Sequence, residues 1–126
     1  MVDPFEKRLY EVQVQLFDRE AALARVGDDE ELLVELVRIF LDDYPNSLSE
    51  INEAIAKQNP PLLERAAHTL KGAVANFGAD AVVKEAFELE CQGRSGDLSH
   101  AGENLTRLHE VIQRLDYELR PIAGSI

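Results

Sequence analysis

His68 is the residue of this 126-residue chain best placed to do chemistry, because it stands opposite the apolar side of an amphipathic segment. The apolar residues recur at helical spacing and comprise Leu63, Ala66, Ala67, Leu70, Val74 and Phe77. At about 100° per residue, His68 lies about 150° from the centre of this stripe. We therefore expect His68 to face solvent from a helix whose other side is buried. An exposed imidazole with one free lone pair is a good nucleophile near neutral pH.

The residues within two turns of His68 suit an anionic group such as a phosphoryl group. Lys71, three residues on, can place its ammonium beside an anion on the ring. Gly72 and Ala75 keep the surface low, although glycine costs a helix interior about 0.5–1 kcal/mol relative to alanine. Close approach of a partner would explain that glycine. Glu64, one turn before His68, either favours the imidazolium or orients the ring, and the spacing leaves both open.

The elements before this segment also have helical periodicity. A short helix over about 18–26 should end at Gly27, and Asp28 with Glu31 should cap the next helix. The stripe of that next helix is Leu33, Val37, Phe40, Tyr44, Leu48, Ile51 and Ile55. It keeps its phase through Pro45, which favours one long kinked helix, with a break as the alternative.

Three further helices complete the pattern. The third should start at Asn59-Pro60-Pro61 and run to about Phe77, before Gly78. The fourth should span about 80–92, with a turn between Gly93 and Gly96. Its expected inward residues are Val83, Ala86, Phe87 and Leu89. The fifth should be capped by Asp97 and ended by Pro121 and Gly124, with the seam Leu98, Ala101, Leu105, Leu108, Ile112, Leu115 and Leu119.

Four substantial helices joined by short loops predict an all-α fold, an antiparallel up-down-up-down four-helix bundle. The short helix at 18–26 should cap one end of it. We assign residues 17–120 to the bundle and 121–126 to a C-terminal tail. Residues 1–16 read as a linker or extension, because Tyr10, Val12, Val14 and Leu16 alternate with polar residues at a strand period.

Composition excludes several classes of function. The net charge of −11 argues against nucleic acid and anionic membranes as partners. The single cysteine, Cys91, can close neither an internal disulfide nor a zinc site. Without a long apolar run or a signal-peptide pattern, we expect a soluble, cytoplasmic chain, and a monomer because its seams are used within the bundle. No Gly-rich phosphate loop is present, so we expect no nucleotide site and no kinase activity.

A recognisable pattern surrounds His68. The stretch Ala67-His68-Thr69-Leu70-Lys71-Gly72, followed by Asn76-Phe77-Gly78-Ala79, resembles the active helix of histidine-containing phosphotransfer (HPt) domains. Residues 17–33 also look like the lead-in to such domains in hybrid sensor kinases, and the resemblance covers about residues 17–119. Family members often have a serine pair where this chain has Ala73 and Val74. Of these, Val74 falls on the buried stripe and Ala73 near its edge.

This resemblance implies a specific role. His68 would be phosphorylated, with Lys71 and Gly72 bordering it. The chain would carry the phosphoryl group from the phospho-aspartate of one receiver domain to another response regulator. Its partners would be receiver domains and a hybrid sensor histidine kinase. It would hold no cofactor or metal itself, because the partner receiver supplies the magnesium ion and the aspartate.

Three alternatives remain beside this interpretation. A metal-binding bundle fits poorly, since the nearest motif is Asp97-x-x-His100 and His68 points outward. A plain interaction module would share the bundle but would not need His68, Lys71 and Gly72 together. The phosphoacceptor domain of a chemotaxis-type kinase would share the chemistry, with a kinase catalytic domain as its donor. We interpret His100 and His109 as ordinary surface residues.

Overall fold

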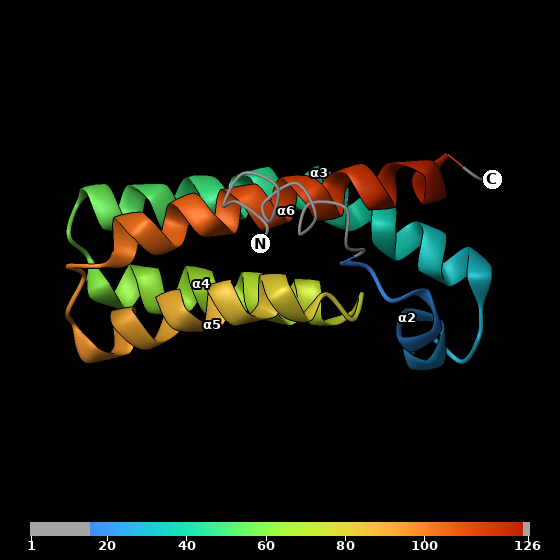
Figure 1. The fold of residues 1–126 in the computed structure, drawn as a ribbon, viewed down its shortest axis with the longest axis horizontal. Helices are drawn as coiled ribbons and strands as arrows, with labels where there is room; N and C mark the ends of the chain where they lie inside the picture. Colours follow the sequence, from blue (N-terminus) through green and yellow to red (C-terminus); the bar gives the residue numbers. More distant parts are fainter. Residues whose placement is uncertain (1–15, 125–126) are drawn as a thin grey trace, which may run out of the picture.

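Helices form all the regular structure in residues 16–124, the part of the chain that the computed structural model describes. They are α2 (Arg19–Arg25), α3 (Glu30–Ala56), α4 (Pro60–Ala75), α5 (Asp80–Ser95) and α6 (Ala101–Ala123). Figure 1 shows α3 to α6 side by side with consecutive helices antiparallel, and α2 at one end near the start of α3. Helix α4 packs on α3 and α5, and α6 closes the bundle against the same two helices. The predicted all-α bundle is confirmed, whereas the strand-like residues 1–15 lie outside the described part.

Helix α3 begins at a different cap from the predicted one. Gly27 and Asp28 both take positive φ angles, 63° and 61°, as the chain turns out of α2. A capping residue needs an extended backbone, which Asp28 therefore lacks. Asp29 has that backbone, and its side chain accepts a hydrogen bond from the Leu32 amide at 3.1 Å. The prediction that Asp28 caps this helix is wrong by one residue.

The long helix predicted through Pro45 is confirmed. Helix α3 is continuous over 27 residues with Pro45 inside it, and Figure 1 shows its first part inclined to the remainder. Of its predicted stripe, Tyr44 and Ile55 are only partly buried and the other members form part of the core. Tyr44 reaches α6 instead, where its hydroxyl donates to the Asp116 carboxylate.

Helix α4 has the predicted start and the predicted buried side. The Asn59 side chain accepts a hydrogen bond from the Leu62 amide at 3.3 Å, and Pro60 is the first helical residue. Leu63, Ala66, Ala67, Leu70, Val74 and Phe77 are each at most 2% exposed. Helix α4 ends at Ala75, and Gly78 takes a φ of 61° just beyond it. The core therefore fixes α4 along its whole length.

Helix α5 differs from its prediction in both length and orientation. It runs on to Ser95, so Gly93 lies inside the helix and not at a turn. Phe87, expected to face inward, is 46% exposed, whereas Glu90 is 3% exposed. The helix is thus turned so that Glu90 and Gly93 face its neighbours, because α4 packs against it there.

Gly93 allows α4 and α5 to approach closely. A Cβ atom at Gly93 would lie 2.5 Å from the Glu64 backbone nitrogen and 2.8 Å from the Pro60 carbonyl oxygen. Real Cβ atoms do not come so near to backbone, so only glycine fits this crossing. The residue predicted to break the helix instead lets two helices pack.

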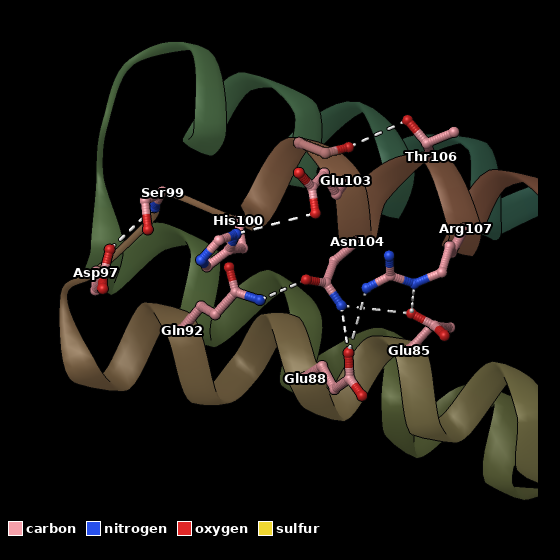
Figure 2. A network of polar contacts seen from close by, with 11 residues as sticks. Glu85, Glu88, Gln92, Asp97, Ser99, His100, Glu103, Asn104, Thr106 and Arg107 are labelled. Carbon is pink, nitrogen blue, oxygen red and sulfur yellow. Dashed lines mark hydrogen bonds and ion pairs between the residues drawn. The ribbon is translucent and has the colours of Figure 1, made fainter.

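A polar network joins α5 to α6 on another side of α5 (Figure 2). Asn104 is 2% exposed and accepts a hydrogen bond from Gln92 at 2.6 Å, while its amide donates to Glu88. Arg107 forms ion pairs with Glu85 at 3.3 Å and with Glu88 at 3.6 Å. The buried amide is therefore satisfied, as a buried polar group must be.

The start of α6 differs from its prediction, whereas its predicted end is confirmed at Gly124 but not at Pro121. Its first residue is Ala101, and Asp97 instead closes the preceding turn by accepting from the Ser99 amide at 3.0 Å. Pro121 lies inside the last turn, and the helix ends at Ala123, so the assignment of residues 121–123 to a C-terminal tail is wrong. The seam itself is confirmed, because its seven residues are all buried, none more than 9% exposed.

We predict that Gly93→Ala destabilises the domain by about 1–3 kcal/mol, since the added methyl group must push α4 and α5 apart. Gly72→Ala is the matched control, because it is also inside a helix but a Cβ there meets nothing within 4 Å. It should stabilise the fold by about 0.5–1 kcal/mol. Urea unfolding followed by circular dichroism gives both values. A Gly93→Ala variant as stable as the wild type would contradict the close crossing.

Candidate functional site

His68 lies in the middle of α4 on its solvent side. Its side chain is 67% exposed, although Ala67 and Leu70 beside it in the sequence are buried. The helix that carries it is fixed by the core and capped by Asn59. The predicted exposure of His68 is therefore confirmed, and the ring stands on a rigid support.

Glu90 of α5 holds the imidazole from the side. Its Oε2 atom lies 3.1 Å from His68 Nδ1, although its own side chain is only 3% exposed. A carboxylate so deeply buried must be paired or hydrogen-bonded. It is therefore a fixed acceptor that sets the orientation of the ring.

Two cations complete the surroundings of Glu90. Lys71 Nζ lies 2.7 Å from Oε1, and Arg94 Nη2 lies 2.9 Å from Oε2. Burial acts to raise the pKa of Glu90, but the hydrogen bonds and charges of Lys71 and His68 outweigh it and leave the pKa below its ordinary value. Glu90 is therefore ionised at neutral pH.

An ionised Glu90 selects the tautomer of His68. A carboxylate can only accept hydrogen bonds, so Nδ1 must carry the proton that it shares with Glu90. In the neutral form of the ring, the Nε2 atom then keeps its lone pair. Because no proton has to leave Nε2 first, this imidazole can attack an electrophile without a general base.

The other predicted site residues lie near His68, with different contacts from those expected. Only 26% of the Lys71 side chain is exposed, and its ammonium lies 5.0 Å from the centre of the Phe87 ring. Glu64 does not hold the imidazole; its Oε2 atom lies 2.9 Å from Arg94 Nε. The structure thus joins Lys71 to His68 through the carboxylate of Glu90.

The predicted low surface beside His68 is formed by the small residues Gly72 and Ala75. Gly72 is exposed, and a Cβ atom added to it would have nothing within 4 Å, so internal packing does not require a glycine there. Ala75 is partly buried on the same helix. At the positions where the family often has serine, Val74 is fully buried and Ala73 is partly buried against the core. Neither lies on the exposed side that carries His68.

Glu90 and Arg94 were missed by the sequence interpretation. A signal for Glu90 existed, because Val82, Ala86, Leu89 and Gly93 form the buried side of α5 and Glu90 falls among them. Charged residues are almost never buried unless they are paired. A carboxylate within such a stripe therefore indicates a cation or an imidazole on the facing helix.

Comparison with known proteins now identifies the family of this chain. A family model described as "Hpt domain" matches residues 35–118. The chain belongs to the Hpt domain family. Hpt domains carry out histidine phosphotransfer in two-component phosphorelays, and response regulators and kinases are their partners.

Known proteins resemble this Hpt domain in sequence and in fold. Phosphorelay protein LuxU of Vibrio cholerae serotype O1 is 27% identical over 85 residues, which cover 68% of this chain and 75% of that protein. LuxU of Vibrio vulnificus (strain YJ016) is 29% identical over 82 residues, covering 62% and 71%. The crystal structure of histidine-containing phosphotransfer protein B (HptB) from Pseudomonas aeruginosa PAO1 superposes with a TM-score of 0.82. It is 19% identical and covers 90% of this chain and 99% of its own.

The helices of this Hpt domain carry no membrane-spanning segment within residues 16–124, since none of them is both long and apolar enough. His100 and His109, interpreted as surface residues, are both exposed, His100 immediately before α6 and His109 within it. Neither has the buried carboxylate that accompanies His68.

We predict that Glu90→Gln lowers the free energy of unfolding at pH 7 by about 1–3 kcal/mol, because a buried polar network loses its charged acceptor. The variant should also lose part of the acid sensitivity of the domain. The folded-state pKa of Glu90 is lowered, so its contribution is complete above the unfolded-state value of about 4.3. That contribution is lost as the pH falls through the folded-state pKa. Urea unfolding between pH 3 and pH 7 measures both effects, and equal slopes for wild type and variant would refute this role.

Proposed function

We propose that His68 is the residue of this Hpt domain that accepts a phosphoryl group from the phospho-aspartate of a receiver domain and passes it to another response regulator. One observation carries the proposal. The exposed imidazole has its Nδ1 atom held by the buried, ionised Glu90, which leaves the lone pair of Nε2 available.

The transfer step follows from this arrangement. The Nε2 lone pair forms a bond to phosphorus while the bond from phosphorus to the aspartyl oxygen breaks, and the aspartate leaves as a carboxylate. No proton is taken up or released in the step, and the ring acquires a positive charge. Glu90 lies against Nδ1 and stabilises that charge. The reverse step regenerates the neutral imidazole, so the same geometry serves transfer in both directions.

The neighbours of His68 have separate roles in this proposal. Lys71 stabilises the phosphoryl form by keeping Glu90 ionised and in place, since its ammonium is bound to Oε1. Gly72 and Ala75 provide the low surface on which the receiver comes close to the ring. Glu64 acts on the site through Arg94, the residue to which it is bound.

The remaining chemistry belongs to the partners. We place the magnesium ion and the reacting aspartate in the receiver domain, and we assign no kinase activity to this chain. A hybrid sensor histidine kinase is the proposed source of the phosphoryl group. We further propose that the domain works in the cytoplasm as a monomer, with the helices from α2 to the end of α6 as the functional unit.

The first test is phosphotransfer from a phosphorylated receiver. His68→Gln should abolish labelling, because the replacement has no nucleophilic ring nitrogen, and the label on the wild type should be acid-labile and base-stable. His100→Gln and His109→Gln are matched controls at the start of α6 and within it, and should label at the wild-type rate. Phosphoryl label that remains on the His68→Gln variant would refute the assignment of His68 as the phosphoryl-accepting residue.

The second test concerns the docking surface at Gly72. A glutamine there should fold well, because it is a good helix former and a Cβ meets nothing within 4 Å. Its side chain leans back toward His68, one turn earlier, and should obstruct the receiver. We expect Gly72→Gln to melt no lower than wild type and to transfer at least ten-fold more slowly. A variant that melts higher and transfers at the wild-type rate would exclude docking on this side.

A further inference from the structure

Arg94 occupies the middle of a chain of ion pairs beside His68. Its Nη2 atom lies 2.9 Å from Glu90 Oε2, and its Nε atom lies 2.9 Å from Glu64 Oε2. Glu64 comes from α4 and Glu90 from α5, so the guanidinium bridges the two helices.

The same contacts bring Arg94 next to the reacting ring. Glu90 Oε2 accepts from Arg94 Nη2 and lies 3.1 Å from His68 Nδ1, so one oxygen joins the guanidinium to the imidazole. An open hollow at this point is lined by Pro61, Glu64, Arg65, His68, Glu90 and Arg94. The guanidinium and the imidazole therefore line the same hollow.

The two carboxylates that hold Arg94 differ in how firmly they hold it. The side chain of Glu90 is 3% exposed, whereas those of Glu64 and Arg94 are 40% and 59% exposed. An ion pair open to water adds little stability and is readily exchanged. Arg94 therefore has one fixed anchor and one replaceable partner.

Lys71, the other cation bound to Glu90, is less able to change partners. Only 26% of its side chain is exposed, and its ammonium is held both by Glu90 Oε1 and over the Phe87 ring. Removing it from that position would leave the buried carboxylate less compensated. Of the two cations, Arg94 is the one free to turn toward a new charge.

We propose that Arg94 is a phosphoryl-binding residue that exchanges partners: when His68 Nε2 carries the phosphoryl group, Arg94 keeps Glu90 and leaves Glu64 for the phosphoryl oxygens. This inference rests on the proposed function of His68. A phosphoryl group carries up to two negative charges and three acceptor oxygens, and guanidinium binds such groups in a bidentate manner. The phosphoryl group therefore outcompetes the single exposed carboxylate of Glu64 for the Arg94 guanidinium.

The exchange gives Glu64 a defined effect. Because Glu64 holds Arg94 only in the unphosphorylated form, it competes with the phosphoryl group for the same cation. Removing its charge should favour the phosphorylated form, and removing Arg94 should disfavour it. The two effects should depend on one another, since both act through one guanidinium.

The test uses the full chain with His100→Gln and His109→Gln, which leaves His68 as the single histidine of the sequence. Phosphoramidate serves as a small-molecule donor, so no receiver is needed. Two signals are measured: the ¹⁵N–¹H resonance of Arg94 Nε before and after phosphorylation, and the pKa of the phosphoryl group by ³¹P titration. The titration compares Glu64→Gln, Arg94→Gln and the double variant. Arg107→Gln is the control, because Arg107, like Arg94, pairs with two glutamates but lies on α6, away from His68 (Figure 2).

We expect the Arg94 Nε resonance to shift on phosphorylation. Arg94→Gln should raise the phosphoryl pKa by roughly half a pH unit, the size typical of an exposed ion pair. Glu64→Gln should lower the phosphoryl pKa, and this decrease should be smaller in the variant that also lacks Arg94. Arg107→Gln should leave the phosphoryl pKa unchanged. An unshifted resonance, or additive effects of the two variants, would overturn the exchange while leaving His68 as the phosphoryl site. If neither phosphoramidate nor a phosphorylated receiver forms phosphohistidine at His68, the proposed function fails together with this inference.

Discussion

Helices α4 and α5 approach so closely at Gly93 that a Cβ atom there would lie only 2.5 Å from the Glu64 backbone nitrogen. This contact fixes the register of the two helices. The two helices are antiparallel, so a step of one turn forward along α4 corresponds to a step of one turn back along α5. Starting from the contact at Gly93, this step brings His68 of α4 beside Glu90 of α5. One more turn in the same directions brings Lys71 to the Phe87 ring. A larger residue at position 93 would separate the helices and weaken every polar contact of the site.

The close packing of α4 and α5 also buries Glu90, and this burial governs the electrostatics of the site. A carboxylate removed from water is costly unless cations and hydrogen bonds replace its hydration, and here Lys71, Arg94 and His68 replace it. Its charge in turn fixes the tautomer of His68. The site thus places Lys71 and Arg94, each paired with a carboxylate, beside the ring at which we propose that a phosphoryl group is received.

Sequence reasoning worked well wherever a local rule acts alone. The buried stripe of α4 and the exposure of His68 follow from helical spacing, and the cap at Asn59 follows from side-chain chemistry. It failed where two local rules compete. Asp28 and Asp29 are both good capping residues, and the turn conformation at Asp28 decided between them. Gly93 was interpreted as a helix end because glycine is a weak helix former, but the neighbouring helix required it inside α5.

The sequence by itself therefore determined the helices, the all-α bundle and the exposed histidine, since these depend on periodicity and on the chemistry of residues close together in the chain. The tertiary structure alone decided what surrounds that histidine. Glu90 is 22 residues from His68 in the sequence, and Arg94 is 30 residues from Glu64. Their contacts depend on the distance and rotation of α5 relative to α4. No single-helix pattern encodes those two quantities, because they are set by how the side chains of both helices pack.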